Sequence, residues 1–359
     1  MNETHSAPGE RVDVAASQAA SLLERAQGRL VAVIGDPILD RYVYGEPQRV
    51  AREAPVLILR WAGDEERAGG AANAAANASA LGARVELVGL VGQDRAADRL
   101  EALMEQQGIA HTLVRDAGRP TTVKTRFVAG SRQTVWQQVL RLDRWEGGFA
   151  NGEALARLVE AARLAASRAD AVILSEYGAG TLAPPVRDAA MEAAKARGAP
   201  VVVDSRYRLL DFGGAFAATP NTGEAEHAVG RPLRVEQDFV EAGQKLLAKL
   251  DVRLLVLTRG EEGMSLFFRD GRRPLRLMAY RPREVYDVSG AGDTVISALA
   301  LGLTVGEEHA VAAALLADVA AGLVVAKRGV ATVSAGEVRE ALEAWAPEVY
   351  ALPMPQEGR

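Results

Sequence analysis

The sequence predicts an α/β fold in which helices cover both faces of a mostly parallel central sheet, with a small antiparallel β lid added to it. Short apolar runs, several of them rich in Val and Ile, alternate along the chain with Ala-rich segments of helical period. Such alternation is typical of parallel strands joined by covering helices. Two stretches, 41–61 and 121–143, contain strand-like runs with no helix between them. We expect these two stretches to form the lid.

The individual elements follow from the same patterns. Strands are expected where apolar runs precede a small or turn-forming residue, at 30–34, 56–59, 85–91, 123–128, 139–142, 171–174, 201–203 and 254–257. Helices are expected where apolar residues recur at helical spacing, at 71–81, 94–107, 153–168, 184–197, 239–250 and 294–302. Together these elements predict one α/β unit over 28–345, with a tail and surface helix at 1–27 and a tail at 346–359.

Composition excludes several classes of protein. With 48% hydrophobic and 25% charged residues in 359, the chain matches ordinary globular proteins and not disordered or fibrous ones. A net charge of −5 argues against wholesale nucleic-acid binding, and the absence of Cys excludes disulfides and zinc thiolate sites. The most apolar stretch, 310–326, is interrupted by Asp318. We expect a cytoplasmic protein with no nucleic-acid or membrane partner.

The strongest motif is the string YDVSGAGDT at 286–294. Gly290 and Gly292 leave backbone amides uncovered at the start of a helix, where unpaired N–H groups and the helix dipole attract a phosphoryl group. Asp293 would lie in the first turn, where it could accept a proton from a hydroxyl that attacks phosphorus. An Asp that only stabilises its own helix is the alternative. The full string favours Asp293 as the base, with the amides of Gly290, Ala291 and Gly292 holding the developing charge.

At this string the sequence resembles the ribokinase-like (PfkB) family of carbohydrate kinases, and the likeness extends over about 28–340. The family's Gly-Gly-x-x-Asn turn matches 69–73, and its N-x-x-E and T-x-G motifs match 221–224 and 258–260. The resemblance implies a ribokinase-like three-layer sandwich, with ATP as co-substrate and Mg²⁺ as the metal.

The same resemblance assigns roles to residues at the matching positions. Those implied in sugar binding are Asp40, Gly69, Gly70 and Asn73. Those implied in nucleotide and Mg²⁺ binding are Asn221, Thr222, Gly223, Glu224, Thr258, Arg259 and Gly260, with Glu224 acting on the metal through water.

Within the family, the closest likeness is to the bacterial kinases of D-glycero-β-D-manno-heptose 7-phosphate. It is carried by the segments 35–45, 52–56, 67–73, 122–126 and 285–295. This likeness implies transfer of the ATP γ-phosphoryl to the anomeric (C1) hydroxyl, giving the 1,7-bisphosphate used for lipopolysaccharide heptose.

A substrate that already carries a phosphate needs a cationic pocket. Basic residues fall in or beside the two expected lid segments, namely Arg49, Arg52, Lys124, Arg126 and Arg132. We assign Arg52, Lys124 and Arg126 to substrate binding. The alternative is that these charges only prevent edge-to-edge pairing of an exposed strand.

Two acidic residues follow predicted strands at the sheet edge where open parallel sheets bind ligands. They are Glu176, which we assign to the substrate, and Asp204, which we leave unassigned. Heptose kinases often have Ser-Asp-Tyr and Asp-Pro-Lys at these places, so the chain departs from that pattern at Glu176, Ser205 and Arg206. These departures leave the details of the metal and nucleotide contacts open.

Other functions remain alternatives. A family relative acting on fructose 1-phosphate, another sugar phosphate or a nucleoside is the nearest, and a non-catalytic nucleotide-binding regulator is a more distant one. A dinucleotide-dependent oxidoreductase is disfavoured because no G-x-G-x-x-G follows the first strand. The family likeness also implies a homodimer. Apolar lid residues could form its interface, namely Val56, Leu57, Ile58 and Trp61, and their packing within one chain is an equal alternative.

Overall fold

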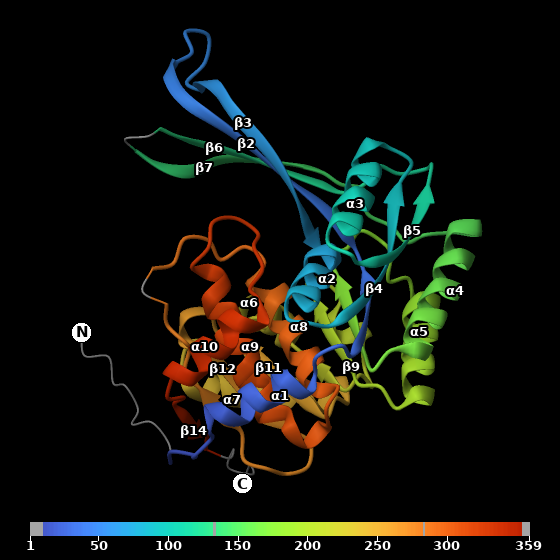
Figure 1. The fold of residues 1–359 in the computed structure, drawn as a ribbon, viewed down its shortest axis with the longest axis vertical. Coiled ribbons are helices and arrows are strands. Elements are labelled where there is room, and N and C mark those ends of the chain that lie inside the picture. Colours follow the sequence, from blue (N-terminus) through green and yellow to red (C-terminus); the bar gives the residue numbers. More distant parts are fainter. Residues whose placement is uncertain (1–9, 132–133, 283, 354–359) are drawn as a thin grey trace.

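A ten-stranded sheet covered by helices forms the body of the molecule, and a four-stranded sheet projects from it (Figure 1). This computed structural model describes residues 10–131, 134–282 and 284–353. Arg132 therefore lies outside the described residues. The predicted α/β class, with a mostly parallel sheet and a β lid, is confirmed.

The main sheet is parallel from one edge to its seventh strand. Its order is β14-β13-β12-β11-β10-β9-β8-β1-β4-β5. Only three pairs of neighbouring strands are antiparallel, namely β11 with β12, β12 with β13, and β13 with β14. The strands are β1 (Leu30–Gly35), β4 (Arg84–Gly92), β5 (Ala110–Asp116), β8 (Ala171–Glu176), β9 (Val201–Ser205), β10 (Ala217–Ala218), β11 (Leu254–Thr258), β12 (Met264–Phe268), β13 (Leu275–Leu277) and β14 (Val349–Ala351).

Alternate residues of the central strands point into two separate cores, as the period-two geometry of a strand requires. In β1, Val31 and Val33 pack into one core and Ala32 and Ile34 into the other. The first core is closed by α1 (Ala16–Arg25), α2 (Ala71–Ala80), α3 (Arg95–Gln106), α8 (Ala291–Leu303), α9 (Ala310–Val325) and α10 (Ala335–Ala344). The second is closed by α4 (Gly152–Arg168), α5 (Pro184–Arg197), α6 (Thr222–Val229) and α7 (Glu236–Leu250).

One helical segment within the described ranges, Glu307–Val325, is long and apolar enough to cross a membrane. It consists of a short 3₁₀ turn, Glu307–His309, followed by α9, and 67% of its most apolar 18-residue window is buried inside the protein. It contacts α8, α1 and α10. Its apolar composition is therefore explained by its place in the first core.

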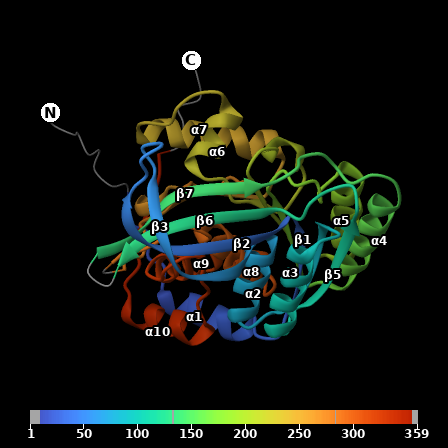
Figure 2. The ribbon, with the colours of Figure 1, turned by 90° about the horizontal axis from the view of Figure 1, so that it is seen from above.

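The lid consists of two antiparallel hairpins, β2 (Pro37–Val50) with β3 (Leu57–Gly70) and β6 (Val123–Ser131) with β7 (Thr134–Arg144). They join through β2 and β6, which run parallel, so the lid is a mixed sheet and not a purely antiparallel one. Seen from above, its four strands lie side by side over the body (Figure 2). The strands also extend beyond the predicted 41–61 and 121–143, and β2 and β3 run directly into the body.

The root of the lid is fastened to the loop that follows α9. The Arg67 guanidinium donates to the carbonyl oxygens of Arg328 at 2.8 Å and Val330 at 2.7 Å. The Tyr42 hydroxyl accepts a bond from the Val330 N–H at 3.1 Å. Farther out, the pairing of β2 with β3 shifts register twice, after Tyr44 and after Pro47.

Segments expected to be terminal tails take part in the body. Helix α1 packs against α9 and α10, and Arg11 pairs with Tyr350 beside β14. Strand β14 extends the main sheet through β13. The described residues on both sides of the 28–345 unit thus complete one edge of the sheet.

Candidate active site

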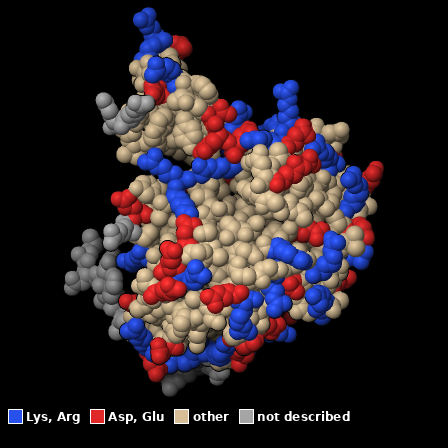
Figure 3. Space-filling model, viewed as in Figure 1, with Lys and Arg blue, Asp and Glu red and all other residues tan. Residues whose placement is uncertain are grey.

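A cleft of about 470 Å³ lies between the lid and the carboxyl ends of the parallel strands. The space-filling view shows basic and acidic side chains where the lid meets the body (Figure 3). Residues from the lid and the body line the cleft together, among them Asp40, Gly70, Lys124, Arg126, Tyr177, Asp204, Arg206, Asn221, Glu224, Thr258, Gly290, Gly292 and Asp293.

The start of α8 forms the predicted anion-binding turn. Gly290 caps the helix with φ +83°, and a Cβ there would lie 2.7 Å from the Asn73 amide nitrogen, so only glycine fits. Within the described chain, the N–H groups of Gly290 and Gly292 have no backbone acceptor, whereas that of Ala291 donates to Val288 at 3.3 Å. The two glycine amides are therefore more available to an anion than the predicted Ala291 amide.

Asp293 is buried in the first turn of α8, and each of its oxygens has a fixed donor. Oδ2 accepts from the Asn73 amide at 2.7 Å, and Oδ1 accepts from the Tyr177 hydroxyl at 2.9 Å. Burial raises the pKa of this carboxyl to about 6, although the two donors oppose the rise. Asp293 is thus a stronger base than an ordinary Asp.

The Gly-Gly-x-x-Asn turn places α2 against α8. Asn77 donates to Asn73 Oδ1 at 3.1 Å and accepts from the Thr294 hydroxyl at 2.9 Å, so the side chain behind Asp293 is itself held in place. A Cβ at Gly69 would overlap the Asp40 carboxylate, so this glycine lets Asp40 lie against the backbone. Both ends of the Asn73 amide thus have protein partners, and its nitrogen holds the Asp293 carboxylate in place.

The basic residues of the lid differ in how far their charges are neutralised. Arg126 forms a buried ion pair with Asp40, whose pKa is nevertheless raised because burial outweighs the arginine. Arg141 pairs with Asp143 at 2.9 Å. Lys124 forms no ion pair among the described residues, and its ammonium lies 4.9 Å from the centre of the Tyr177 ring. Burial lowers the pKa of Lys124, so an anion bound there would offset its desolvation.

One residue assigned to the substrate, Arg52, and the unassigned basic residue Arg49 lie away from the cleft. Arg52 is exposed in the turn between β2 and β3, at the far end of the lid hairpin. Arg49 is exposed near the end of β2. Neither lines the cleft. Within one chain, Lys124 and Arg126 are therefore the assigned basic residues that the structure brings to the site.

On the other side of the cleft, α6 begins with a reciprocal pair of hydrogen bonds. Asn221 Oδ1 accepts from the Glu224 N–H, and Glu224 Oε2 accepts from the Asn221 N–H, both at 3.0 Å. Thr222 and Gly223 form the first turn of α6, and the Thr222 hydroxyl donates to the Thr258 carbonyl at 3.4 Å. This arrangement keeps the Glu224 carboxylate at the cleft wall.

Asp204 and Glu224 form an acidic pair that fits a magnesium ion. Burial raises the pKa of both carboxyls, and repulsion from Glu224 and Asp293 raises that of Asp204 further. The positive charge of Arg206 opposes the rise in both pKa values. The described residues contain no cluster of three or more metal-ligating side chains. Mg²⁺ is commonly held by one or two carboxylates together with water and phosphate oxygens, so a pair is sufficient.

The comparison with protein families agrees with the resemblance that the motifs indicate. The family described as "pfkB family carbohydrate kinase" matches residues 29–335. The chain belongs to this family.

Curated relatives of this pfkB-family chain include two proteins called Bifunctional protein HldE. The one from Azorhizobium caulinodans is 43% identical over 332 residues, which cover 91% of this chain and 67% of the relative. The one from Pseudomonas aeruginosa is 44% identical over 314 residues, covering 87% and 63%. The chain thus spans about two thirds of the length of these relatives.

Solved structures share the fold at lower identity. Phosphofructokinase-2 from Escherichia coli, in complex with potassium, has a TM-score of 0.70 at 18% identity, covering 89% of this chain and 99% of that one. Ribokinase from Arabidopsis thaliana, complexed with ribose and ATP, has a TM-score of 0.65 at 21% identity, covering 88% and 99%. These structures confirm the ribokinase-like sandwich.

Two side chains of the kinase that were predicted to bind ligands interact with other protein groups instead. The Glu176 carboxylate accepts from the Ser205 hydroxyl at 2.7 Å and the Tyr207 N–H at 3.1 Å, and it does not line the cleft. The Arg259 guanidinium is buried over Phe239 and pairs with Glu236 at 2.7 Å. Both side chains hold the loops around the cleft in place. Gly260, next to Arg259, has φ +58° in a short 3₁₀ turn.

Sequence reasoning missed Tyr177 and left Asp204 unassigned, although both line the cleft. Each stands at or just beyond the carboxyl end of a parallel strand, β8 or β9. This position at the end of a strand was the sequence signal that could have identified both residues. After β8, it led to the acidic Glu176 instead of its neighbour Tyr177.

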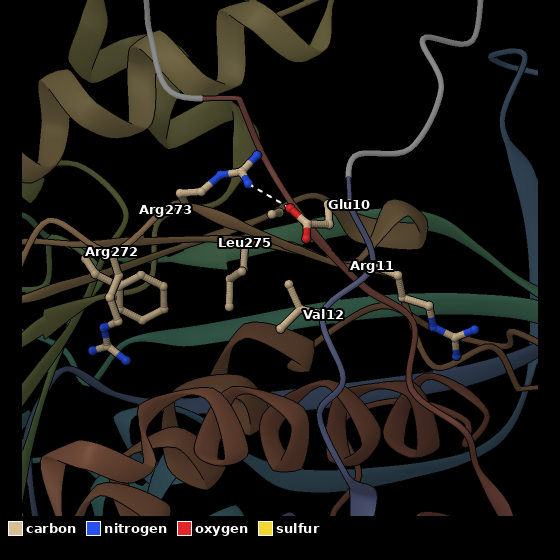
Figure 4. Close-up of a pocket in the computed structure, with 8 residues that line it drawn as sticks. Glu10, Arg11, Val12, Arg272, Arg273 and Leu275 are labelled. Carbon is tan, nitrogen blue, oxygen red and sulfur yellow. Dashed lines mark hydrogen bonds and ion pairs between the residues drawn. The ribbon is translucent and has the colours of Figure 1, made fainter.

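A second hollow lies near the β14 edge of the main sheet, beside β13 and β14 (Figure 4). Its charges are largely matched: Arg273 pairs with Glu10 at 3.1 Å, and Arg272 pairs with Asp270 at 2.8 Å. It contains none of the family motifs. The cleft beneath the lid, which residues of the family motifs line, is therefore the candidate kinase site.

Proposed function

We propose that this kinase transfers the γ-phosphoryl of ATP to the anomeric hydroxyl of D-glycero-β-D-manno-heptose 7-phosphate, giving the 1,7-bisphosphate. The observation that carries the proposal is Asp293, a buried carboxylate with a pKa of about 6 that opens onto the cleft beside the free amides of Gly290 and Gly292. The heptose substrate is supported by the sequence likeness at the lid and the two glycine motifs. An unpaired lysine in the cleft suits a sugar that already carries a phosphate.

The acceptor hydroxyl gives its proton to Asp293 as its oxygen bonds to the γ-phosphorus and the bond from that phosphorus to ADP breaks. At pH 7 to 8, a carboxyl with a pKa of about 6 is mostly ionised and is a better proton acceptor than an ordinary Asp. The Gly290 and Gly292 amides hold the charge that develops on the migrating group. An anomeric hydroxyl is more acidic than other sugar hydroxyls, which makes the transfer easier.

Sugar hydroxyls would bond to the buried Asp40 carboxylate, which Arg126 holds in place. An analogue lacking those hydroxyls would leave a buried charge without its full set of bonds, so it should bind poorly. Lys124 would bind the phosphate already on the sugar. The lid above these groups would exclude water and limit ATP hydrolysis.

The nucleotide would lie on the side of the cleft formed by α6 and the turn after β11. Asp204 and Glu224 would hold Mg²⁺, the latter through water, and Arg206 would face the phosphates. When bound, Mg²⁺ neutralises charge on the phosphate oxygens. Thr222, Gly223 and the 258–260 turn would form the rest of this wall.

Phosphorus NMR of the product formed from ATP and heptose 7-phosphate tests the proposal, because it reports both the substrate and the position modified. We expect a new anomeric phosphate signal, coupled to the C1 proton. Fructose 1-phosphate, fructose 6-phosphate and a nucleoside serve as competing acceptors. Faster phosphorylation of any of these, or a product phosphorylated elsewhere, would overturn the assignment.

We also propose a homodimer formed through the lid. Apolar side chains are exposed on its strands, including Trp61, which is 67% exposed, and Leu142, which is 62% exposed. Exposed apolar patches of this kind favour association. Light scattering should show a dimer for the wild type and a monomer for Trp61→Glu. Leu164→Glu, at an exposed apolar residue of α4, is the control and should remain dimeric.

We place the reaction in the cytoplasm, because the proposed transfer consumes ATP. Fractionation of cells that express the tagged chain checks this placement, and recovery with the membrane fraction would contradict it.

A further inference from the structure

A phenol lies against the proposed base and has no part in the reaction described above. Tyr177 follows β8, and its backbone N–H donates to the buried Asp36 carboxylate at 2.7 Å. The same carboxylate accepts from the N–H groups of Ala179 at 3.0 Å and Thr181 at 2.9 Å. The loop is therefore fixed from below, and it delivers the Tyr177 hydroxyl to Asp293 Oδ1 at 2.9 Å.

The surroundings of this pair define the direction of the hydrogen bond. Burial and the nearby charges of Asp293 and Asp204 raise the pKa of Tyr177 well above its ordinary value, so the phenol keeps its proton and donates. Asp293 also faces the Lys124 ammonium, which favours its ionised form, and the Asp40 carboxylate, which disfavours it. Among the described residues, Tyr177 and Asn73 are the two groups that donate directly to the carboxylate.

We propose that Tyr177 is a positioning residue that keeps Asp293 ionised and correctly oriented, while its ring supports the Lys124 ammonium. One donor on each oxygen fixes the plane of the carboxylate and leaves the remaining lone pairs for the sugar hydroxyl. The phenol opposes the effect of burial, since a donated hydrogen bond favours the charged form of the carboxyl. Tyr177 keeps its own proton throughout, and only the acceptor hydroxyl gives one up.

The ring contributes separately from the hydroxyl. The Lys124 ammonium lies 4.9 Å from the ring centre, within the range of a cation–π contact, and forms no ion pair among the described residues. A flat aromatic face thus supports the cation assigned to the sugar phosphate. Removing only the hydroxyl, or the whole ring, separates the two effects.

The test compares Tyr177→Phe and Tyr177→Leu in single-turnover reactions between pH 5 and 9, with ATP saturating. Because the Phe variant loses the donor but keeps the ring, we expect its acid limb to move to higher pH by about one unit. We expect its affinity for the sugar phosphate to stay close to that of the wild type. The Leu variant should show the same shift and, in addition, bind the sugar phosphate several-fold more weakly.

Tyr350→Phe is the matched control, since it removes a phenol that donates to a carboxylate, Glu348, away from the cleft. Its pH profile should match that of the wild type. An unchanged or lowered acid limb in Tyr177→Phe would overturn the inference, even if all rates fell together.

The inference rests on the proposed role of Asp293, and the two can fail separately. If Asp293→Asn retained turnover, the proposed base would be wrong. If Asp293→Asn were inactive while Tyr177→Phe kept the wild-type profile, only the role of Tyr177 would be wrong.

Discussion

Asp318 allows the effect of one buried carboxyl on stability to be calculated from the structure. It lies in the apolar helix α9, is 5% exposed, and accepts a hydrogen bond from the Tyr280 N–H at 2.6 Å. Burial raises its pKa from 3.8 to about 7. Asp318→Asn keeps an oxygen that can accept the same bond but removes the ionisation. We expect this variant to be more stable than the wild type at pH 8.

The sign follows from proton linkage. Because the pKa is higher in the folded state, the folded protein binds the proton more tightly than the unfolded chain, and this contribution to stability is lost as pH rises from about 4 to about 7. Each pH unit within that window is worth about 1.4 kcal/mol. Between pH 5 and 8, the wild type should therefore lose about 3 kcal/mol relative to Asp318→Asn.

Urea unfolding of both proteins at pH 5, 6, 7 and 8 measures this difference. Asp188→Asn removes an exposed carboxyl on α5 and is the control, for which we expect a difference that does not change with pH. Parallel pH dependences for the wild type and Asp318→Asn would refute the reasoning. So would a loss of stability in Asp318→Asn that is equal at every pH.

Three further predictions concern the site. Asp293→Asn should lower turnover by about 10²–10⁴ while calorimetry still detects binding of ATP and sugar; near-normal turnover would remove Asp293 from its role. Lys124→Ala should raise KM for a phosphorylated sugar far more than for its unphosphorylated analogue, and equal losses would contradict the phosphate assignment. Gly290→Ala should cut turnover, and it should lose more stability than Gly108→Ala, which has a similar φ of +67° but open space around it. Equal melting temperatures with normal turnover would show that the contact with Asn73 is unimportant.

Local signals in the sequence located many elements of the fold. The predicted 184–197 coincides with α5, because two prolines mark its start and Gly198, with φ +74°, ends it. Strand β5 was missed, since its sequence AHTLVRD mixes polar and apolar residues at the edge of the sheet. The parallel pairing of β2 with β6 could not be predicted, because residues about 80 apart are joined only by the tertiary fold.

In the candidate site, too, local motifs predicted some features, and others depend on the tertiary fold. Motif spacing pointed to Asp40, Glu224 and Asp293, which line one cleft in the structure, and to Asn73, which is not part of the cleft lining but donates to Asp293. Motif spacing carried no information on the pKa of Asp293, which burial raises above that of an ordinary Asp. The burial of a side chain and its choice of partner depend on the whole fold. For the same reason, the ion pair between Asp40 and Arg126 could not be predicted.

The fastening of the lid at Arg67 determines where the lid can bend. Its root is tied to the carbonyls of Arg328 and Val330, so a hinge there would break two hydrogen bonds to a charged group. The register shifts of β2 after Tyr44 and Pro47 interrupt the ladder farther out and are the weaker points. Opening should therefore swing only the outer half of the hairpin, leaving the inner half, which carries Asp40, as a rigid floor while substrates enter and products leave.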